Sequence, residues 1–320
     1  MAYSEAYLPA PPERNAHAPR RGVGRWVRAL RDRLGDRLGL PLRVRAALRE
    51  GALRPVGLQP PARSACYSSV VRWDRLGRGG PEDSWCEDPL SLPGLGPPAL
   101  TRVETQPRWP CEIRRVEALT ASHSPLERFA CLDSLVTSVT PELLGDVSGD
   151  GVRSNLAYRG VRIARGGPDY FVWHQWDGRV VLANSGGAHH FSAARWLAGR
   201  VGRRVWLNGL LIRHVLDRPR LTELRRRFHL FAVRGGAEHA RLREALRRLG
   251  ATHHGCPAPE PHVGVDLVFL PRDERRARRV ARELSRAGFL DVGAYLERLA
   301  LSPEHPDLPQ LLAAPWAGQA

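Results

Sequence analysis

The stretch Asp177-Gly-Arg-Val-Val-Leu-Ala-Asn-Ser-Gly-Gly-Ala-His-His-Phe-Ser-Ala-Ala-Arg-Trp-Leu-Ala-Gly199 decides the fold prediction. It follows a β-rich run over 169–176, and Asp177-Gly178 between two such runs is a strong hairpin signature. The second run, 179–183, leads through a Gly-Gly turn into a helical pattern over 188–199. The sequence therefore predicts a hairpin, a glycine turn and a helix start in one continuous unit.

The residues on either side extend this pattern. A run over 112–119 suits a strand, and Ser124-Pro-Leu-Glu127 has the cap, the first-turn proline and the capping-box glutamate of a helix start. Strands and helices then alternate toward the C-terminus, which indicates a small α/β layer. The further strands are predicted over 204–207, 210–215, 228–233 and 263–270, and the further helices over 237–249, 273–287 and 291–299.

Together these elements predict an α+β protein with a central hairpin-plus-helix core, a small α/β C-terminal layer and an irregular N-terminal segment. The N-terminal segment is expected to be irregular because it is rich in Pro, Gly, Ser and Trp without sustained periodicity. The predicted divisions are a disordered arm over 1–21, a helical and then irregular segment over 22–111, a central α+β domain over 112–225, a small α/β region over 226–302 and a tail over 303–320.

The charge of the chain is strongly positive. Its 320 residues include 49 Lys and Arg against 33 Asp and Glu, a formal net charge of +16, and every positive residue is Arg. Such a surface attracts polyanions, and Arg makes bidentate contacts to phosphate. Nucleic acid bound through an Arg-rich surface is therefore one candidate partner, and a merely basic surface without a dedicated site is the alternative.

The composition also excludes several classes of protein. With 42% hydrophobic residues the chain is not wholly disordered, and no apolar run reaches the ~18 residues of a membrane helix. The N-terminus lacks the basic-then-apolar order of a secretory signal, and the five cysteines form no CxxC pair. We therefore expect a cytoplasmic protein with reduced thiols and no transmembrane segment.

The glycine turn and the helix start after it form the candidate site. Glycines allow close approach of a ligand, and the N–H groups of a helix N-terminus favour anions. On a helical wheel His190 falls near the apolar face and His189 points away from it, so His189 is the candidate acid/base and His190 is the better candidate for a core histidine. The predicted ligand-binding set also contains Ser185, Gly186, Gly187 and His190, with Asp177 and Arg179 as outer candidates.

The segment Gly186-Gly187-Ala188-His189-His190-Phe191, preceded by its strand with a D-G turn, resembles the ParB/sulfiredoxin superfamily. The corresponding pattern in sulfiredoxin is G-G-C-H-R followed by an aromatic residue. The resemblance extends over 177–199 and implies a nucleotide- or phosphate-binding turn over 185–190, because family members grip ATP or CTP phosphates there. The wider block over 122–196 also resembles an uncharacterised bacterial and phage-associated family of unknown function. That resemblance implies an architecture but no activity.

Two departures limit what this resemblance implies. Ala188 stands where sulfiredoxin has its catalytic cysteine, so sulfinic-acid reduction is not expected. His190 stands where the family has a phosphate-gripping arginine, and a histidine is a weaker and pH-dependent partner.

Metal-binding patterns are present but incomplete. The Asp146-Val-Ser-Gly-Asp-Gly151 stretch begins like a calcium loop, yet Ala157 stands where the bidentate acid belongs. Two histidine groupings have zinc-compatible residue types without a standard spacing. They are His253, His254, Cys256 and His262 in one group, and His174, His189 and His190 in the other. We therefore predict no metal site, and the sequence names no cofactor.

The function predicted from these residues is binding of a nucleotide or a phosphorylated ligand at the Gly-Gly-Ala-His-His helix start. His189 would serve as acid or base in any chemistry on a phosphate ester or anhydride. The alternative is a non-enzymatic basic protein that binds nucleic acid or an acidic partner, and a structural accessory protein without a ligand also stays open.

Overall fold

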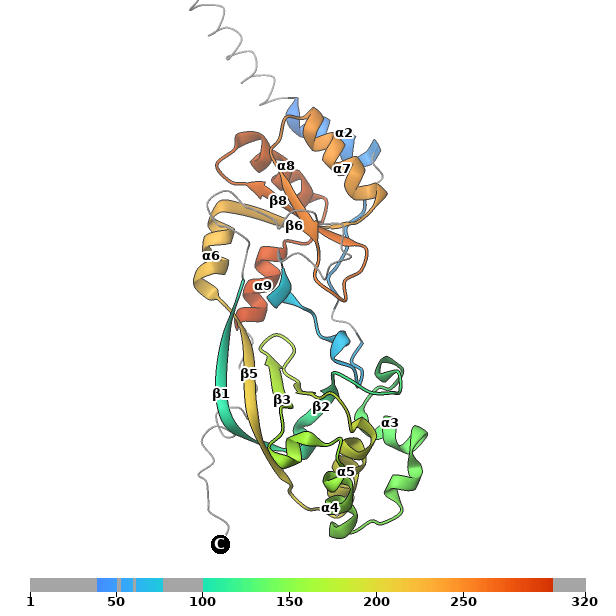
Figure 1. The fold of residues 1–320 in the computed structure, drawn as a ribbon. Coiled ribbons are helices and arrows are strands. Elements are labelled where there is room, and N and C mark those ends of the chain that lie inside the picture. The colour runs from blue at the N-terminus through green and yellow to red at the C-terminus, as the bar shows by residue number, and fades with distance from the viewer. Residues whose placement is uncertain (1–38, 51–52, 60–61, 77–99, 302–320) are drawn as a thin grey trace, which may run out of the picture.

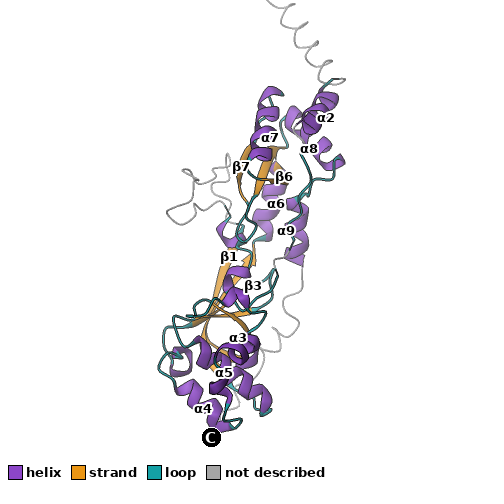
Figure 2. Cartoon of the chain, turned by 90° about the vertical axis from the view of Figure 1, so that its right-hand side faces the viewer, coloured by secondary structure: helices purple, strands orange, loops and turns teal. Residues whose placement is uncertain are grey.

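The computed structural model describes residues 39–50, 53–59, 62–76 and 100–301. Within these residues it shows an elongated molecule built on two sheets (Figures 1 and 2), which confirms the predicted α+β class. No described helix has the length and apolarity needed to cross a membrane. The predicted arm over 1–21 and tail over 303–320 lie outside the described residues.

The larger sheet has five strands in the order β1-β5-β3-β4-β2. The β1–β5 and β3–β4 pairs are antiparallel, and the β3–β5 and β2–β4 pairs are parallel. The strands are β1 (Thr101–Glu112), β2 (Val116–Leu119), β3 (Tyr170–His174), β4 (Val180–Ala183) and β5 (Trp206–Leu216).

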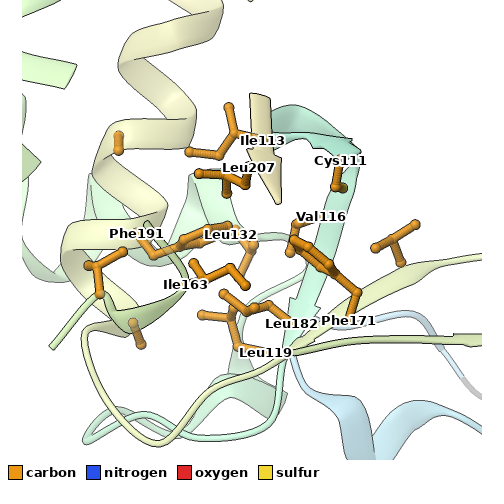
Figure 3. Packing of buried hydrophobic residues seen from close by; sticks show 14 of the residues in the cluster. Cys111, Ile113, Val116, Leu119, Leu132, Ile163, Phe171, Leu182, Phe191 and Leu207 are labelled. Atoms are coloured by element: carbon orange, nitrogen blue, oxygen red, sulfur yellow. The ribbon is translucent and has the colours of Figure 1, made fainter. Parts of the chain in front are cut away.

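Three helices gather at one end of this sheet (Figure 2): α3 (Leu132–Val139), α4 (Gly149–Ala157) and α5 (Ala188–Arg200). α5 packs against both α3 and α4. Of its predicted apolar face, Phe191, Ala194, Leu197 and Ala198 are fully buried, and Val201 is half-buried against the same core. Figure 3 shows Phe191 in the core with Leu132 and with side chains of the sheet. Truncation of such a phenylalanine to alanine costs about 3–5 kcal/mol.

The C-terminal part forms a three-stranded antiparallel sheet in the order β6-β8-β7. Alternate residues of β6 enter two different cores: Phe231 and Val233 pack with α2, α7 and α8, whereas Leu230 and Ala232 pack with α6 and α9. This sheet is therefore covered on both faces. The elements are α2 (Leu40–Glu50), α6 (Arg218–Arg227), β6 (Phe228–Arg234), α7 (Ala237–Arg248), β7 (His254–Pro257), β8 (Val265–Pro271), α8 (Arg275–Arg286) and α9 (Val292–Leu301).

The structure corrects several predicted elements near the start of the central domain. The strand expected over 112–119 is interrupted by the turn Ile113–Arg115, at which the Glu112 carboxylate accepts a hydrogen bond from the Arg114 N–H. The helix expected from Ser124 is a short turn, Leu126–Arg128, and the helix proper starts at Leu132. The Ser124 hydroxyl contacts His189 instead of capping a helix, and α3 begins after Cys131, which forms a capping box with Ser134.

Two further predictions were wrong because the strands β1 and β5 are longer than expected. Eleven of the twelve residues of β1 lie in the segment that we predicted to be irregular, because the antiparallel partner β5 supplies the backbone hydrogen bonds. The two strands expected over 204–207 and 210–215 are the single strand β5. Of the helical part expected at the start of the 22–111 segment, the structure describes α2, and residues 22–38 lie outside the described part.

Candidate functional site

The predicted ligand turn lies where two parallel strands end. Because β2 and β4 are parallel, their carboxyl ends meet at one edge of the sheet. Buried Asn184 joins the chain segments that follow them. Its Oδ1 accepts hydrogen bonds from the N–H groups of Thr120 and Ala121, both at 3.2 Å, and its Nδ2 donates to the carbonyls of Ala121 and Gly186, both at 2.9 Å. This side chain therefore fixes the start of α5 relative to β2.

The two glycines of the turn have different roles. Gly187 is the N-cap of α5 with a φ of +70°, and a Cβ at this position would lie 2.5 Å from the carbonyl carbon of Gly160. A Cβ on Gly186 would meet its nearest neighbour, the Gly160 carbonyl oxygen, at 3.8 Å. Gly187 is thus required for the close contact within the chain, whereas a side chain at Gly186 would make only an ordinary van der Waals contact.

His189 pairs with a serine from the loop after β2. The Ser124 Oγ and the His189 Nε2 lie 2.9 Å apart, and both residues are half-buried. His189 was predicted to point away from the apolar face of the helix, and its ring faces this loop. A hydroxyl within hydrogen-bond reach of an imidazole is the arrangement that activates a nucleophile or relays a proton.

His190 contacts α4 and the residue that follows it. Its Nδ1 lies 3.0 Å from the Asn155 Oδ1, and its ring stacks on Tyr158 with 3.9 Å between ring centroids. The Asn155 Nδ2 donates to the carbonyls of Leu143 and Gly151. The Asn155 Oδ1 is therefore the acceptor, and His190 carries its proton on Nδ1. His190 is half-buried against Tyr158, so the core position expected from the wheel is only partly reached.

The surroundings of both histidines favour the uncharged imidazole. Burial lowers the pKa of His189, the nearby His123 lowers it further, and Glu142 opposes these effects. Burial also lowers the pKa of His190, with a smaller contribution from His189. At neutral pH the pair is therefore suited to accept protons rather than to neutralise a phosphate, and attraction to an anion falls to the amide groups at the α5 N-terminus, which have no side-chain cap.

The structure does not bring the two outer candidates to the glycine turn. Asp177 and Arg179 lie in the 175–179 turn at the opposite end of β4. The Arg179 guanidinium, which is 2% exposed, makes a bidentate pair with the Asp177 carboxylate and donates to the Ser64 carbonyl at 3.1 Å. Both side chains are thus occupied in holding the hairpin to the segment around Ser64. Ser185 is exposed at the glycine turn.

Residues of two of the incomplete metal patterns have other places in the structure. Ser148 of the calcium-like stretch caps α4 by accepting hydrogen bonds from the N–H groups of Asp150 and Gly151. His174 ends β3 at the far end of the hairpin from His189 and His190, so these three do not assemble. In the part of the chain that the structure describes, a group with metal-binding proximity is Asp74, His174 and His214.

Sequence reasoning missed three residues of the site. Ser124 was interpreted as a helix cap, and neither Asn184 nor Asn155 was given a role. A turn asparagine between a strand and a helix is a weak signal, since its partners come from residues 63 and 64 positions away in the sequence. Only the parallel pairing of β2 with β4 reveals the partners.

With this geometry in view, the class of protein is a mixed α+β chain with a Ser–His pair at the end of two parallel strands. A model described as a family of unknown function, DUF6685, matches residues 106–307, and the chain belongs to this family. The matched part includes the whole glycine turn and most of both sheets. No curated protein and no solved structure matches the chain.

Proposed function

We propose that this protein binds a nucleotide or another phosphorylated small molecule at the N-terminus of α5, with His189 as acid or base. The observation that carries the proposal is the 2.9 Å contact between the Ser124 Oγ and the His189 Nε2 beside an uncapped helix start. The resemblance of 177–199 to the ParB/sulfiredoxin superfamily supports a phosphate at this turn.

The roles of the residues follow from their contacts. The first amides of α5 would hold a phosphate oxygen, and Gly186 would leave room for it. His189, uncharged at neutral pH, would take the proton of the Ser124 hydroxyl or of a water as that oxygen attacks phosphorus. The same imidazole could then protonate the leaving oxygen. Asn184 and Asn155 would position the turn and His190 without contacting the ligand.

A thermal-shift panel tests ligand binding. Purified full-length chain would be heated with ATP, CTP, GTP and inorganic phosphate, each with and without Mg²⁺. A ligand at 100 times its Kd stabilises the fold by ~2.7 kcal/mol, which gives a clear rise in Tm. We expect a nucleotide-dependent rise that is lost in His189→Ala and kept in His253→Ala, a histidine in the loop before β7. No rise with any of these ligands, or equal rises in both variants, would contradict the proposal.

A second candidate function, polyanion binding, is favoured by the surface around α2. Figure 1 shows α2 beside α7, with α8 next to them, and α2 packs against both. Two open grooves flank α2, and each is lined by four arginines with fewer glutamates. The arginines are Arg43, Arg241, Arg248 and Arg276 in one groove and Arg45, Arg49, Arg54 and Arg286 in the other.

Salt dependence separates this function from the first. We propose that the α2–α7–α8 surface binds nucleic acid through phosphate contacts, so affinity would fall steeply as salt increases. Fluorescence anisotropy with a labelled DNA duplex and a single-stranded RNA, each at 50 and 200 mM salt, measures it. The double variant Arg241→Ala/Arg276→Ala should bind more weakly, with the exposed pair Arg203→Ala/Arg204→Ala at the end of α5 as the matched control. Equal losses in both double variants would indicate net charge alone.

A further inference from the structure

A polar cluster lies inside the molecule between its two sheets, away from the α5 site. Asp74 and His174 are buried, at 8% and 1% exposure, and His214 is half-buried. One ligand atom from each of the three side chains lies within 4.8 Å of the other two. Side chains of these types are costly to bury unless they have matched partners, so their convergence calls for a common ligand or a closed network.

Strand pairing sets the two histidines side by side. His174 ends β3 and is the parallel partner of His214 on β5. Because paired residues point to the same face, their rings stack, with centroids 4.6 Å apart and an angle of 6° between the planes. The ring of Trp176 packs edge-on against His174 and closes another side of the cluster.

Asp74 reaches the histidines from a distant part of the chain. It belongs to the short turn Trp73–Arg75 in the segment that runs between the two ends of the molecule (Figure 1). Trp73, 1% exposed, anchors this turn in the core shared with α6 and α9, and the Trp176 Nε1 donates to the Val71 carbonyl at 2.8 Å. The carboxylate is therefore held firmly in front of His174.

The donor spacing fits a small divalent cation. The His174 Nε2 lies 3.7 Å from the Asp74 Oδ1 and 3.3 Å from the Tyr67 Oη. Ligand atoms about 2.0–2.1 Å from a tetrahedral zinc ion are about 3.3–3.5 Å apart. The ligand atom of His214 lies within 4.8 Å of the other two. Because the two imidazole rings are parallel, one ring must turn about its side-chain bonds for both nitrogens to face the same ion. Two histidines, one carboxylate and a fourth oxygen from Tyr67 or water are a donor set that suits zinc.

Arg72 is the group that a cation site must accommodate. Its guanidinium makes a bidentate pair with the Asp74 carboxylate, with contacts of 2.9 and 2.6 Å. Carboxylate ligands of metals are commonly held by such hydrogen bonds, which orient them, and the Asp74 Oδ1 keeps a second lone pair toward His174. The positive charge of Arg72 weakens cation binding, so we expect a lower affinity for zinc than at a site without a neighbouring cation.

We propose that Asp74, His174 and His214 form a zinc site that ties the 62–76 segment to β3 and β5. This revises the sequence-based prediction of no metal site. The cation would link parts of the chain that are about a hundred residues apart, and it would lie at the junction of the two sheets. Its role would be structural, since the cluster is enclosed by Trp176 and Tyr67.

The test uses the full chain, stripped with a chelator, desalted and titrated with zinc chloride. We expect one zinc per chain by elemental analysis and a rise in Tm on addition of zinc. Co²⁺ in place of zinc should give the visible absorption bands of a four-coordinate ion. His214→Ala, at the half-buried position, should lower zinc affinity by at least about tenfold and abolish the cobalt bands.

Two further variants keep the result interpretable. Asp74→Asn preserves side-chain shape and should also lose zinc, whereas His254→Ala, a half-buried histidine on β7, should bind zinc like the unchanged chain. Circular dichroism of each variant shows whether it is folded. Failure of the folded, unchanged chain to bind zinc, or zinc binding unaffected by His214→Ala, would overturn the proposal and leave the cluster as a hydrogen-bonded network. Neither result bears on nucleotide binding at α5.

Discussion

Gly187 and Gly160 are in direct backbone contact, which places the start of α5 against the loop after α4. A Cβ added at Gly187 would lie 2.5 Å from the carbonyl carbon and 2.6 Å from the carbonyl oxygen of Gly160. We therefore expect Gly187→Ala to destabilise the fold by at least about 2 kcal/mol, from the strained φ and the displaced loop together. Urea unfolding followed by circular dichroism measures the loss.

The neighbouring glycine is the matched control for this prediction. The φ of Gly186 lies outside the left-handed region that favours glycine. A Cβ added to it would meet no atom closer than 3.8 Å. Gly186→Ala should leave stability within about 0.5–1 kcal/mol of the unchanged chain. If ligand phosphate approaches this position, the same variant should nonetheless weaken nucleotide binding. Equal stabilities of Gly186→Ala and Gly187→Ala would contradict the assigned contact.

A second prediction concerns any phosphate-ester chemistry of the Ser124–His189 pair. Ser124→Ala and His189→Ala should each reduce turnover of a nucleotide substrate by about 10²-fold or more, the usual contribution of a positioned acid or base. Because burial lowers the pKa of His189, the acid limb of the rate profile should lie below pH 6.5. His123→Ala should move this limb toward higher pH, because it removes a group that lowers the same pKa. An acid limb above pH 7 would contradict the assignment.

The hairpin and helix were predictable from sequence because their signals are local. β3, β4 and α5 each follow from short patterns of alternation, a D-G turn and a 3.6-residue apolar period. The turn itself is longer than the predicted two residues, since β3 ends at His174 and β4 begins at Val180. Side chains outside the strands explain the difference: the pairing of Asp177 with Arg179 stabilises a wider turn.

The site was less accessible to sequence reasoning because its partners are distant. Ser124 meets His189 across 65 positions, and Asp74 meets His174 across a hundred. No periodicity or spacing encodes such contacts. The first arises from the parallel pairing of β2 with β4, and the second from the packing of the turn Trp73–Arg75 into the core shared with α6 and α9. His189 could be proposed from the sequence alone, because a histidine in the first turn of a helix places a titratable ring beside free backbone N–H groups.

A third prediction concerns acid sensitivity at His229 on β6. Burial and the charges of Arg272, Arg282 and Arg278 lower its pKa to about 4, against the opposing effect of Asp291. The folded state therefore prefers the uncharged ring. Its stabilising contribution is complete above the unfolded pKa of about 6.5, falls as the pH drops below that value, and is lost near pH 4.

The variant His229→Gln isolates this effect. Allowing for partial exposure of the ring, we expect the unchanged chain to lose about 1–2 kcal/mol more than the variant between pH 7.5 and pH 4.5. Urea unfolding at both pH values gives the comparison, and other titrating groups cancel because they are common to the two proteins. Identical pH dependence in the two proteins would show that His229 is not shielded in the folded state.

A fourth prediction separates the two roles of Asn184. The Asn184 Oδ1 accepts hydrogen bonds from two backbone amides after β2, and the Nδ2 donates to two carbonyls. Asn184→Asp keeps the acceptors but loses both donors and sets a negative charge against carbonyl oxygens. Since an unsatisfied buried group costs about 1–3 kcal/mol, we expect a loss of at least about 2 kcal/mol at pH 7.

That loss should shrink in acid, because a protonated carboxyl regains one donor. Asn184→Ala, which removes acceptors and donors together, should be destabilised at every pH, without the recovery. The backbone amides of Thr120 and Ala121 should also exchange with solvent faster in Asn184→Ala than in Asn184→Asp, since the aspartate still accepts from them. Hydrogen exchange that is unchanged in both variants would mean that the strand ends of β2 and β4 hold the α5 start without this side chain.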